Sequence, residues 1–138
     1  MKYLAGLFAL TIASAALADG SSRPYAMGGW IEDFQPVIDR YNASGELFRI
    51  QGHCQSLCTM FLGLRNVCVE RSAELLFHAG HDRQRNISAK STERMLNAYN
   101  AGLRQYVTAS HYMDTLAFHT VSGAAIIDKF GYKECPKQ

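Results

Sequence analysis

The chain lacks several features that would place it in a common functional class. Beyond residue 18 it has no apolar run long enough to cross a bilayer, and it has no internal repeat or low-complexity segment. Its charges nearly balance, with 14 Lys and Arg against 12 Asp and Glu, and no basic stripe marks a nucleic-acid or anionic membrane surface. We therefore predict no nucleic-acid partner and no membrane span in the mature protein.

The first residues carry an export signal. Lys2 gives a short positive start, an alanine-rich apolar run follows from Leu4 to Leu17, and Ala16-Leu17-Ala18 has the A-x-A form of a cleavage site. Residues 1–18 are therefore predicted to be a signal peptide. Residues 19–138 are predicted to form a single periplasmic or secreted domain, large enough for a modest core.

All four cysteines, Cys54, Cys58, Cys68 and Cys135, lie in the predicted mature chain. An even number in an exported domain favours two disulfides, for which three pairings are open. A bond between Cys54 and Cys58 would close a very short loop. A bond to Cys135 would close a long loop and tie the C-terminal end to the body of the domain.

A zinc site is the competing interpretation of these cysteines, because His53, His78 and His81 are also available. The spacings of the cysteines and histidines match no standard zinc pattern. We therefore expect no metal and no other cofactor.

Helical and strand-like patterns alternate along the mature chain, which implies an α/β fold with mainly parallel strands. Pro36 suits only the first turn of a helix, so the first regular helix is expected to begin close to it. Helices are predicted over 30–41, 56–64, 91–107 and 122–130, with strands over 46–51, 67–69 and 74–78. Ser91 or Thr92 is expected to cap the long third helix, and Ser122 and Gly131 to delimit the last one.

The most informative stretch is Gly52-His53-Cys54-Gln55-Ser56-Leu57-Cys58-Thr59, which places a serine between two cysteines where a strand is predicted to turn into a helix. The apolar run Leu75-Leu76-Phe77 then leads to His78. A serine at a helix N-terminus and an imidazole from a later strand are the minimum equipment for acyl transfer. The plainer alternative is a helix-capping serine and a buried histidine at a strand end.

These segments resemble the Clp protease proteolytic subunit family of the crotonase-like superfamily, and more closely its small exported bacterial relatives. Those relatives carry a G-x-C-x-S-A-C-T segment, a V-C pair and an F-H pair. This chain matches them with residues 52–59, Val67-Cys68 and Phe77-His78, preceded by Gly28-Gly29. The resemblance implies a shortened crotonase/Clp-protease-like fold, with a small, mainly parallel sheet flanked by helices.

The resemblance also implies roles for individual residues. Ser56 takes the place of the nucleophile, and His78 that of the general base which accepts its proton. Gly29 and Leu57 take the places of the two backbone N–H donors of an oxyanion hole.

The third member of the implied triad is Asp114, which lies nearest to the position of the family's acid, although the alignment there needs a gap. Asp82 follows His78 too closely for the same geometry, and Asp128 lies within the last predicted helix. Without an acid, His78 would lack its orienting partner, which lowers catalysis strongly in triad enzymes.

Two functional hypotheses follow from the sequence. In the first, the chain is an exported serine hydrolase, expected to be a peptidase with a peptide substrate. In the second, it is a catalytically inactive, disulfide-stabilised crotonase-like domain that binds a peptide or assembles as a homo-oligomer. The second hypothesis gains from the short segment before Gly28 and from the absence of a Gly-x-Ser-x-Gly elbow.

Overall fold

The computed structural model describes Leu10 and residues 18–138, so the predicted signal peptide lies almost entirely outside the described residues. Within the described part, no helix has the length and apolar character needed to span a membrane.

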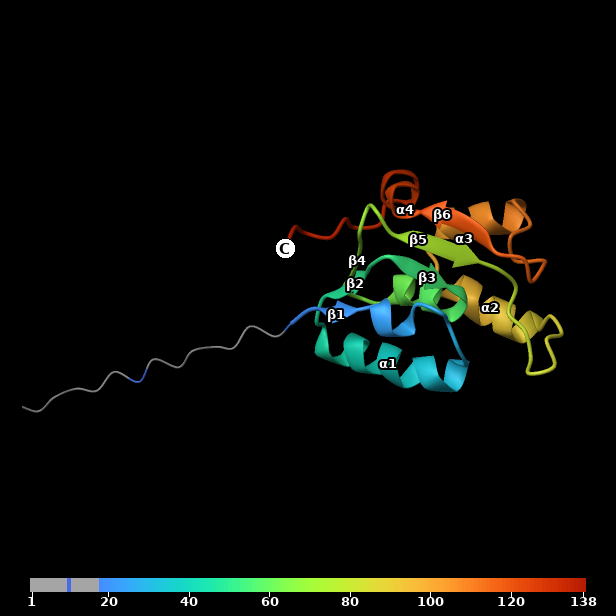
Figure 1. The fold of residues 1–138 in the computed structure, drawn as a ribbon, viewed down its shortest axis with the longest axis horizontal. Coiled ribbons are helices and arrows are strands. Elements are labelled where there is room, and N and C mark those ends of the chain that lie inside the picture. The colour runs from blue at the N-terminus through green and yellow to red at the C-terminus, as the bar shows by residue number, and fades with distance from the viewer. Residues whose placement is uncertain (1–9, 11–17) are drawn as a thin grey trace, which may run out of the picture.

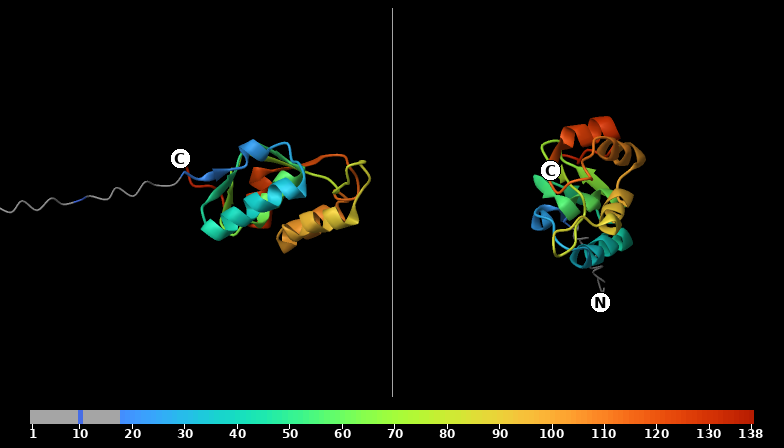
Figure 2. Two further views of the ribbon diagram at one scale, coloured as in Figure 1. Left: turned by 90° about the horizontal axis from the view of Figure 1, so that it is seen from below. Right: turned by 90° about the vertical axis from the view of Figure 1, so that its right-hand side faces the viewer.

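The described chain folds as a mixed α/β protein, as the alternating pattern predicts (Figure 1). Its α-helices are α1 (Ile31–Ser44), α2 (Ala89–Asn97), α3 (Ala101–Ala109) and α4 (Gly123–Phe130), and its 3-10 helices are η1 (Arg23–Tyr25) and η2 (Ser56–Gly63). Its strands are β1 (Gly20–Ser21), β2 (Phe48–Ile50), β3 (His53–Gln55), β4 (Val67–Val69), β5 (Glu74–Phe77) and β6 (His119–Ser122). Helices α1 and α2 lie side by side (Figure 2), where the Arg94 guanidinium donates to Gln35 Oε1 at 3.0 Å.

The strands form two small sheets instead of the single sheet expected. One has the order β1-β2-β4 and is parallel throughout. The other has the order β3-β5-β6, with β3 and β5 parallel and β6 antiparallel to β5. The division occurs at Gly52, whose φ of +59° turns the chain out of the first sheet directly into the second.

Helix α1 begins before Pro36, contrary to the expectation that the proline would mark its first turn. The preceding turn is formed because the amides of Asp33 and Phe34 both donate to the Trp30 carbonyl. Phe34 is only 3% exposed and packs on the core residue Phe61, with ring centroids 5.4 Å apart. Burial of this aromatic ring outweighs the single backbone hydrogen bond that Pro36 removes.

The long helix predicted over residues 91–107 is in fact two helices, α2 and α3. Its first cap is Ser88, whose side chain accepts from the Ser91 amide. Asn100 interrupts the pattern, because its side chain accepts from the Leu103 amide and donates to the Phe130 carbonyl. The cap at Ser122 and the end of α4 at Gly131 are both as predicted.

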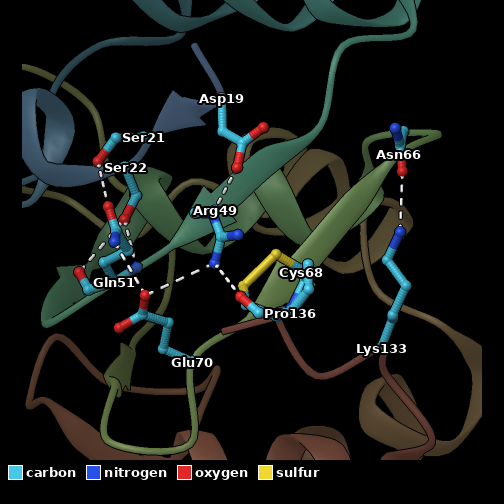
Figure 3. The surroundings of a disulfide bond; sticks show 11 residues. Asp19, Ser21, Ser22, Arg49, Gln51, Asn66, Cys68, Glu70, Lys133 and Pro136 are labelled. Atoms are coloured by element: carbon cyan, nitrogen blue, oxygen red, sulfur yellow. Dashed lines mark hydrogen bonds and ion pairs between the residues drawn. A yellow bond between two sulfur atoms is a disulfide. The ribbon is translucent and has the colours of Figure 1, made fainter. Parts of the chain in front are cut away.

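The two predicted disulfides are present, and the structure resolves their pairing. Cys54 bonds to Cys58 within one turn of chain, and Cys68 bonds to Cys135 across 67 residues. The second bond fastens the C-terminal segment to β4, beside the buried side chain of Arg49 (Figure 3). This cysteine usage is compatible with an extracellular or periplasmic protein.

Candidate active site

Ser56 occupies the sharp turn between β3 and η2. Its φ is +56°, a left-handed value that residues other than glycine rarely adopt. This conformation costs about 1–2 kcal/mol. A strained strand-to-helix turn is also how hydrolases of another fold expose a nucleophilic serine. The absent Gly-x-Ser-x-Gly sequence therefore does not prevent this chain from forming a comparable turn.

Two groups of contacts hold this turn. The Cys54–Cys58 disulfide closes the chain around Ser56, and both of its cysteines are fully buried. On the core side, the Thr59 hydroxyl donates to the Ser56 carbonyl at 2.7 Å and lies 2.6 Å from the Tyr99 hydroxyl. Since the only proton of Thr59 is used on Ser56, Tyr99 is the donor in the second bond.

Gly28 packs directly against the serine turn. Its φ is +74°, and a Cβ there would lie 2.9 Å from Ser56 Cβ and 3.4 Å from Ser56 Oγ. The Gln55 amide donates to the Ala26 carbonyl, and the Gln55 side chain donates to the Met27 carbonyl. A residue other than glycine at position 28 would therefore displace the backbone that carries the serine.

The two predicted oxyanion donors line the same cleft as Ser56. Gly29 and Leu57 line a cleft of about 490 Å³ together with Ser56 and His78. Among the described residues, the Gly29 amide meets no hydrogen-bond acceptor. The Leu57 amide belongs to the first turn of η2, where backbone N–H groups have no acceptor within the helix.

His78 follows β5 and is 4% exposed, and neither ring nitrogen has a hydrogen-bond partner among the described residues. The pKa of His78 is lowered to about 4, first by burial and then by electrostatic repulsion from His81 and Arg85. The ring is therefore neutral at pH 7 and free to accept a proton. The edge-on ring of Phe118, with centroids 4.9 Å apart, packs against it.

The structure does not bring the predicted acid Asp114 to His78. The Asp114 carboxylate lies 2.7 Å from the His111 ring nitrogen, in an exposed local pair three residues apart. Asp82 accepts hydrogen bonds within its own loop, and Asp128 pairs with Arg71. Among the described residues, His78 therefore has no carboxylate to orient it.

The zinc interpretation is not supported by the cysteines, because all four are joined in disulfides. Across the described residues, no group of three or more histidines, cysteines and carboxylates is placed to hold a metal ion.

The cleft has a wall that the sequence patterns did not single out. Trp30 lies between the Arg83 guanidinium, 4.4 Å from its ring centroid, and the edge-on ring of His81 at 5.7 Å. Lys90 and Arg94 of α2 complete this side of the cleft. A single tryptophan beside charged loop residues is too common a pattern to identify such a wall in advance.

In comparisons with known proteins, no family model, no curated protein and no solved structure matches the chain.

Proposed function

We propose that the chain is an exported serine hydrolase that cleaves an ester or peptide bond. The observation that carries this proposal is the strained left-handed conformation of Ser56 in a cleft that it shares with His78, a buried and neutral imidazole. Strained backbone persists only where surrounding contacts enforce it, and such sites are often functional.

In the proposed reaction, Ser56 Oγ attacks the substrate carbonyl while a ring nitrogen of His78 accepts the hydroxyl proton. The Gly29 and Leu57 amides donate hydrogen bonds to the oxyanion of the tetrahedral intermediate. His78 then passes the proton to the leaving alcohol or amine, which leaves an acyl group on Ser56. A water molecule, deprotonated by His78, releases the acid product and restores the serine.

His78 acts in this mechanism without a carboxylate partner, as the base of a Ser–His pair. Packing by Phe118 and burial in the cleft wall orient the ring in place of an acid. The resemblance to exported Clp-protease-like proteins favours a peptide substrate. It also favours a location in the periplasm or outside the cell, in keeping with the disulfides and the predicted signal peptide.

Labelling with a fluorophosphonate, which reacts covalently with activated serines, tests the proposal. Wild-type protein and the Ser91→Ala variant are expected to be labelled, because Ser91 lines the same cleft but has no assigned role. Ser56→Ala should abolish labelling, and His78→Gln should slow it strongly. Equal labelling of wild type and Ser56→Ala, or no labelling of either, would contradict a nucleophilic Ser56.

The alternative is a non-catalytic domain that binds a peptide in this cleft. The observation that favours it is His78 itself, whose two ring nitrogens have no described hydrogen-bond partner. Such a domain would bind the same peptide in wild-type and Ser56→Ala forms without turnover or labelling.

A further inference from the structure

Basic side chains outnumber acidic ones around the candidate site. Four cations line the two adjoining hollows that meet at Ser56 and His78, namely Arg83, Arg85, Lys90 and Arg94. Only two carboxylates, Glu32 and Asp82, line the same hollows. The chain as a whole has nearly equal numbers of basic and acidic residues, so this excess is local.

These cations are not neutralised by the protein. Among the described residues, no carboxylate forms an ion pair with any of the four, although Arg49, Arg71 and Arg104 elsewhere are all paired. The Asp82 carboxylate accepts hydrogen bonds from the amides of Gln84 and Asn86. It therefore organises its own loop and forms no direct ion pair with the cations, so the lining keeps an excess of positive charge.

The backbone and neighbouring side chains hold several of these cations in place. The loop that carries Arg83 and Arg85 is closed by a bridge between His81 and Ile87. Arg83 lies over the ring of Trp30, and Arg94 donates to Gln35 of α1. Positioned guanidinium groups lose less conformational freedom when they bind a carboxylate, which they can do with two parallel hydrogen bonds.

The second hollow adds apolar side chains beside Arg85. Met27 and Phe118 are 71% and 47% exposed, and with Leu116 they border the second hollow. Ser56 and His78 line both hollows, where the cationic wall formed by Arg83, Lys90 and Arg94 adjoins the apolar rim of the second hollow. A substrate that spans the site would meet opposite chemistry on the two sides of its reacting carbonyl.

We propose that the substrates of this site are acidic peptides, with an Asp or Glu carboxylate next to the scissile bond held by Arg83, Lys90 and Arg94. Cleavage of such peptides depends on the proposed hydrolase function, whereas their binding does not. The apolar rim accepts the side chain on the opposite side of the scissile bond.

The test uses pairs of peptides that differ only in Glu or Gln at one position, on the acyl side or on the leaving side of the bond. Turnover is measured as kcat/KM. Binding is measured in the Ser56→Ala protein through the fluorescence of Trp30, the only tryptophan of the chain and a residue of the cleft. We expect one Glu peptide to be preferred over its Gln counterpart by about tenfold, as two or three partly exposed ion pairs allow.

The decisive variant is Arg83→Gln/Lys90→Gln/Arg94→Gln, which leaves Arg85 in place so that the surroundings of His78 keep that charge. Its matched control, Lys129→Gln/Lys133→Gln/Lys137→Gln, removes the same charge from residues that do not line the cleft. The preference for Glu should fall to about onefold in the first variant, persist in the second and decrease with added salt.

The outcomes separate the two proposals. Tighter binding of the Glu peptide without any cleavage would overturn the hydrolase and leave the acidic-peptide site standing. Cleavage or binding with no preference for Glu would overturn the acidic-peptide site, as would a preference that survives in the first triple variant. Absence of any binding to the Ser56→Ala protein, together with absence of cleavage by wild type, would overturn both.

Discussion

At the scale of single residues, the left-handed backbone of Ser56, a conformation that Arg85 and His111 also have, separates it from the helix-capping residues. Ordinary helix-capping residues have extended backbone angles, as Ser88, Asn100 and Ser122 do here. The N-cap of η2 is instead Gln55, and Ser56 is the first residue inside this helix, with a φ of +56°. This difference argues against the plainer interpretation of Ser56 as a helix cap.

The backbone strain at Ser56 predicts that glycine is more stabilising than alanine at this position, the reverse of their order within a helix. Ser56→Gly should be more stable than Ser56→Ala by roughly 1 kcal/mol, because glycine adopts positive φ without penalty. At Ser91, inside α2, glycine should instead be less stable than alanine by about the same amount. Urea unfolding of the four variants measures both differences, and a Ser56→Ala protein as stable as Ser56→Gly would argue against strain.

The lowered pKa of His78 predicts how activity depends on pH. The kcat/KM of the proposed hydrolase should fall only as the pH approaches about 4, instead of near 6.5 as for an ordinary imidazole. Arg85→Gln removes a nearby positive charge and should raise the pKa of His78. NMR titration of the His78 ring measures its pKa in the wild-type and Arg85→Gln proteins, independently of turnover.

The same shift also affects stability. The unfolded chain protonates this histidine near pH 6.5, whereas the folded protein resists protonation until about pH 4. The unfolded state therefore binds more protons between these values, and stability should fall as the pH is lowered across that window. The fall should be smaller in His78→Gln, and an equal fall in both proteins would contradict the lowered pKa.

The candidate site could be predicted from the sequence only in part. The local pattern singles out Ser56 and His78, and the resemblance alone implies Gly29 and Leu57. All four line one cleft. The hydrogen bond from the Tyr99 hydroxyl to Thr59 joins residues 40 positions apart, and no local pattern specifies such a contact.

At the scale of elements, the two disulfides are expected to have different consequences. Cys54–Cys58 closes a short loop around Ser56, whereas Cys68–Cys135 closes a long one between β4 and the C-terminal segment. Chain-entropy arguments give about 2 kcal/mol for the short loop and about 4 kcal/mol for the long one.

We therefore predict opposite profiles for the two double variants. Cys68→Ala/Cys135→Ala should lose more stability in urea unfolding but keep most labelling of Ser56 when folded. Cys54→Ala/Cys58→Ala should lose less stability yet most of its labelling, because the serine turn is released. If the two variants lose labelling in proportion to stability alone, the short disulfide has no role in positioning Ser56.

The elements that the sequence failed to predict have separate physical causes. The split of the sheet follows from the positive φ of Gly52, whereas the split of the long helix at Asn100 depends on contacts with a distant segment. The Asn100 amide, for example, donates a hydrogen bond to the hydroxyl of Tyr132. Periodicity continues through position 100 because the buried faces of α2 and α3 point to the same core.

At the scale of the whole molecule, one buried arginine joins the two ends of the described chain. Arg49 of β2 is 4% exposed, and its guanidinium contacts the Asp19 carboxylate at 2.7 Å and the Pro136 carbonyl at 2.9 Å (Figure 3). The Glu70 carboxylate lies 3.9 Å away. Beside the Cys68–Cys135 bond, this contact fixes the first strand and the C-terminal segment to the same sheet.

The contribution of the Asp19–Arg49 ion pair to the free energy of unfolding can be measured. Asp19→Asn should destabilise the protein by about 1–3 kcal/mol, because a buried guanidinium loses its closest anionic partner. Asp128→Asn is the matched control: it breaks the exposed pair with Arg71 and should cost less than about 1 kcal/mol. Urea unfolding at pH 7 compares the two variants, and equal losses would show that Arg49 is satisfied by Pro136 and Glu70 alone. Because Arg49 does not line the cleft, labelling of Ser56 in folded Asp19→Asn protein should remain at the wild-type level, so a loss of labelling there would connect the ends of the chain to the site.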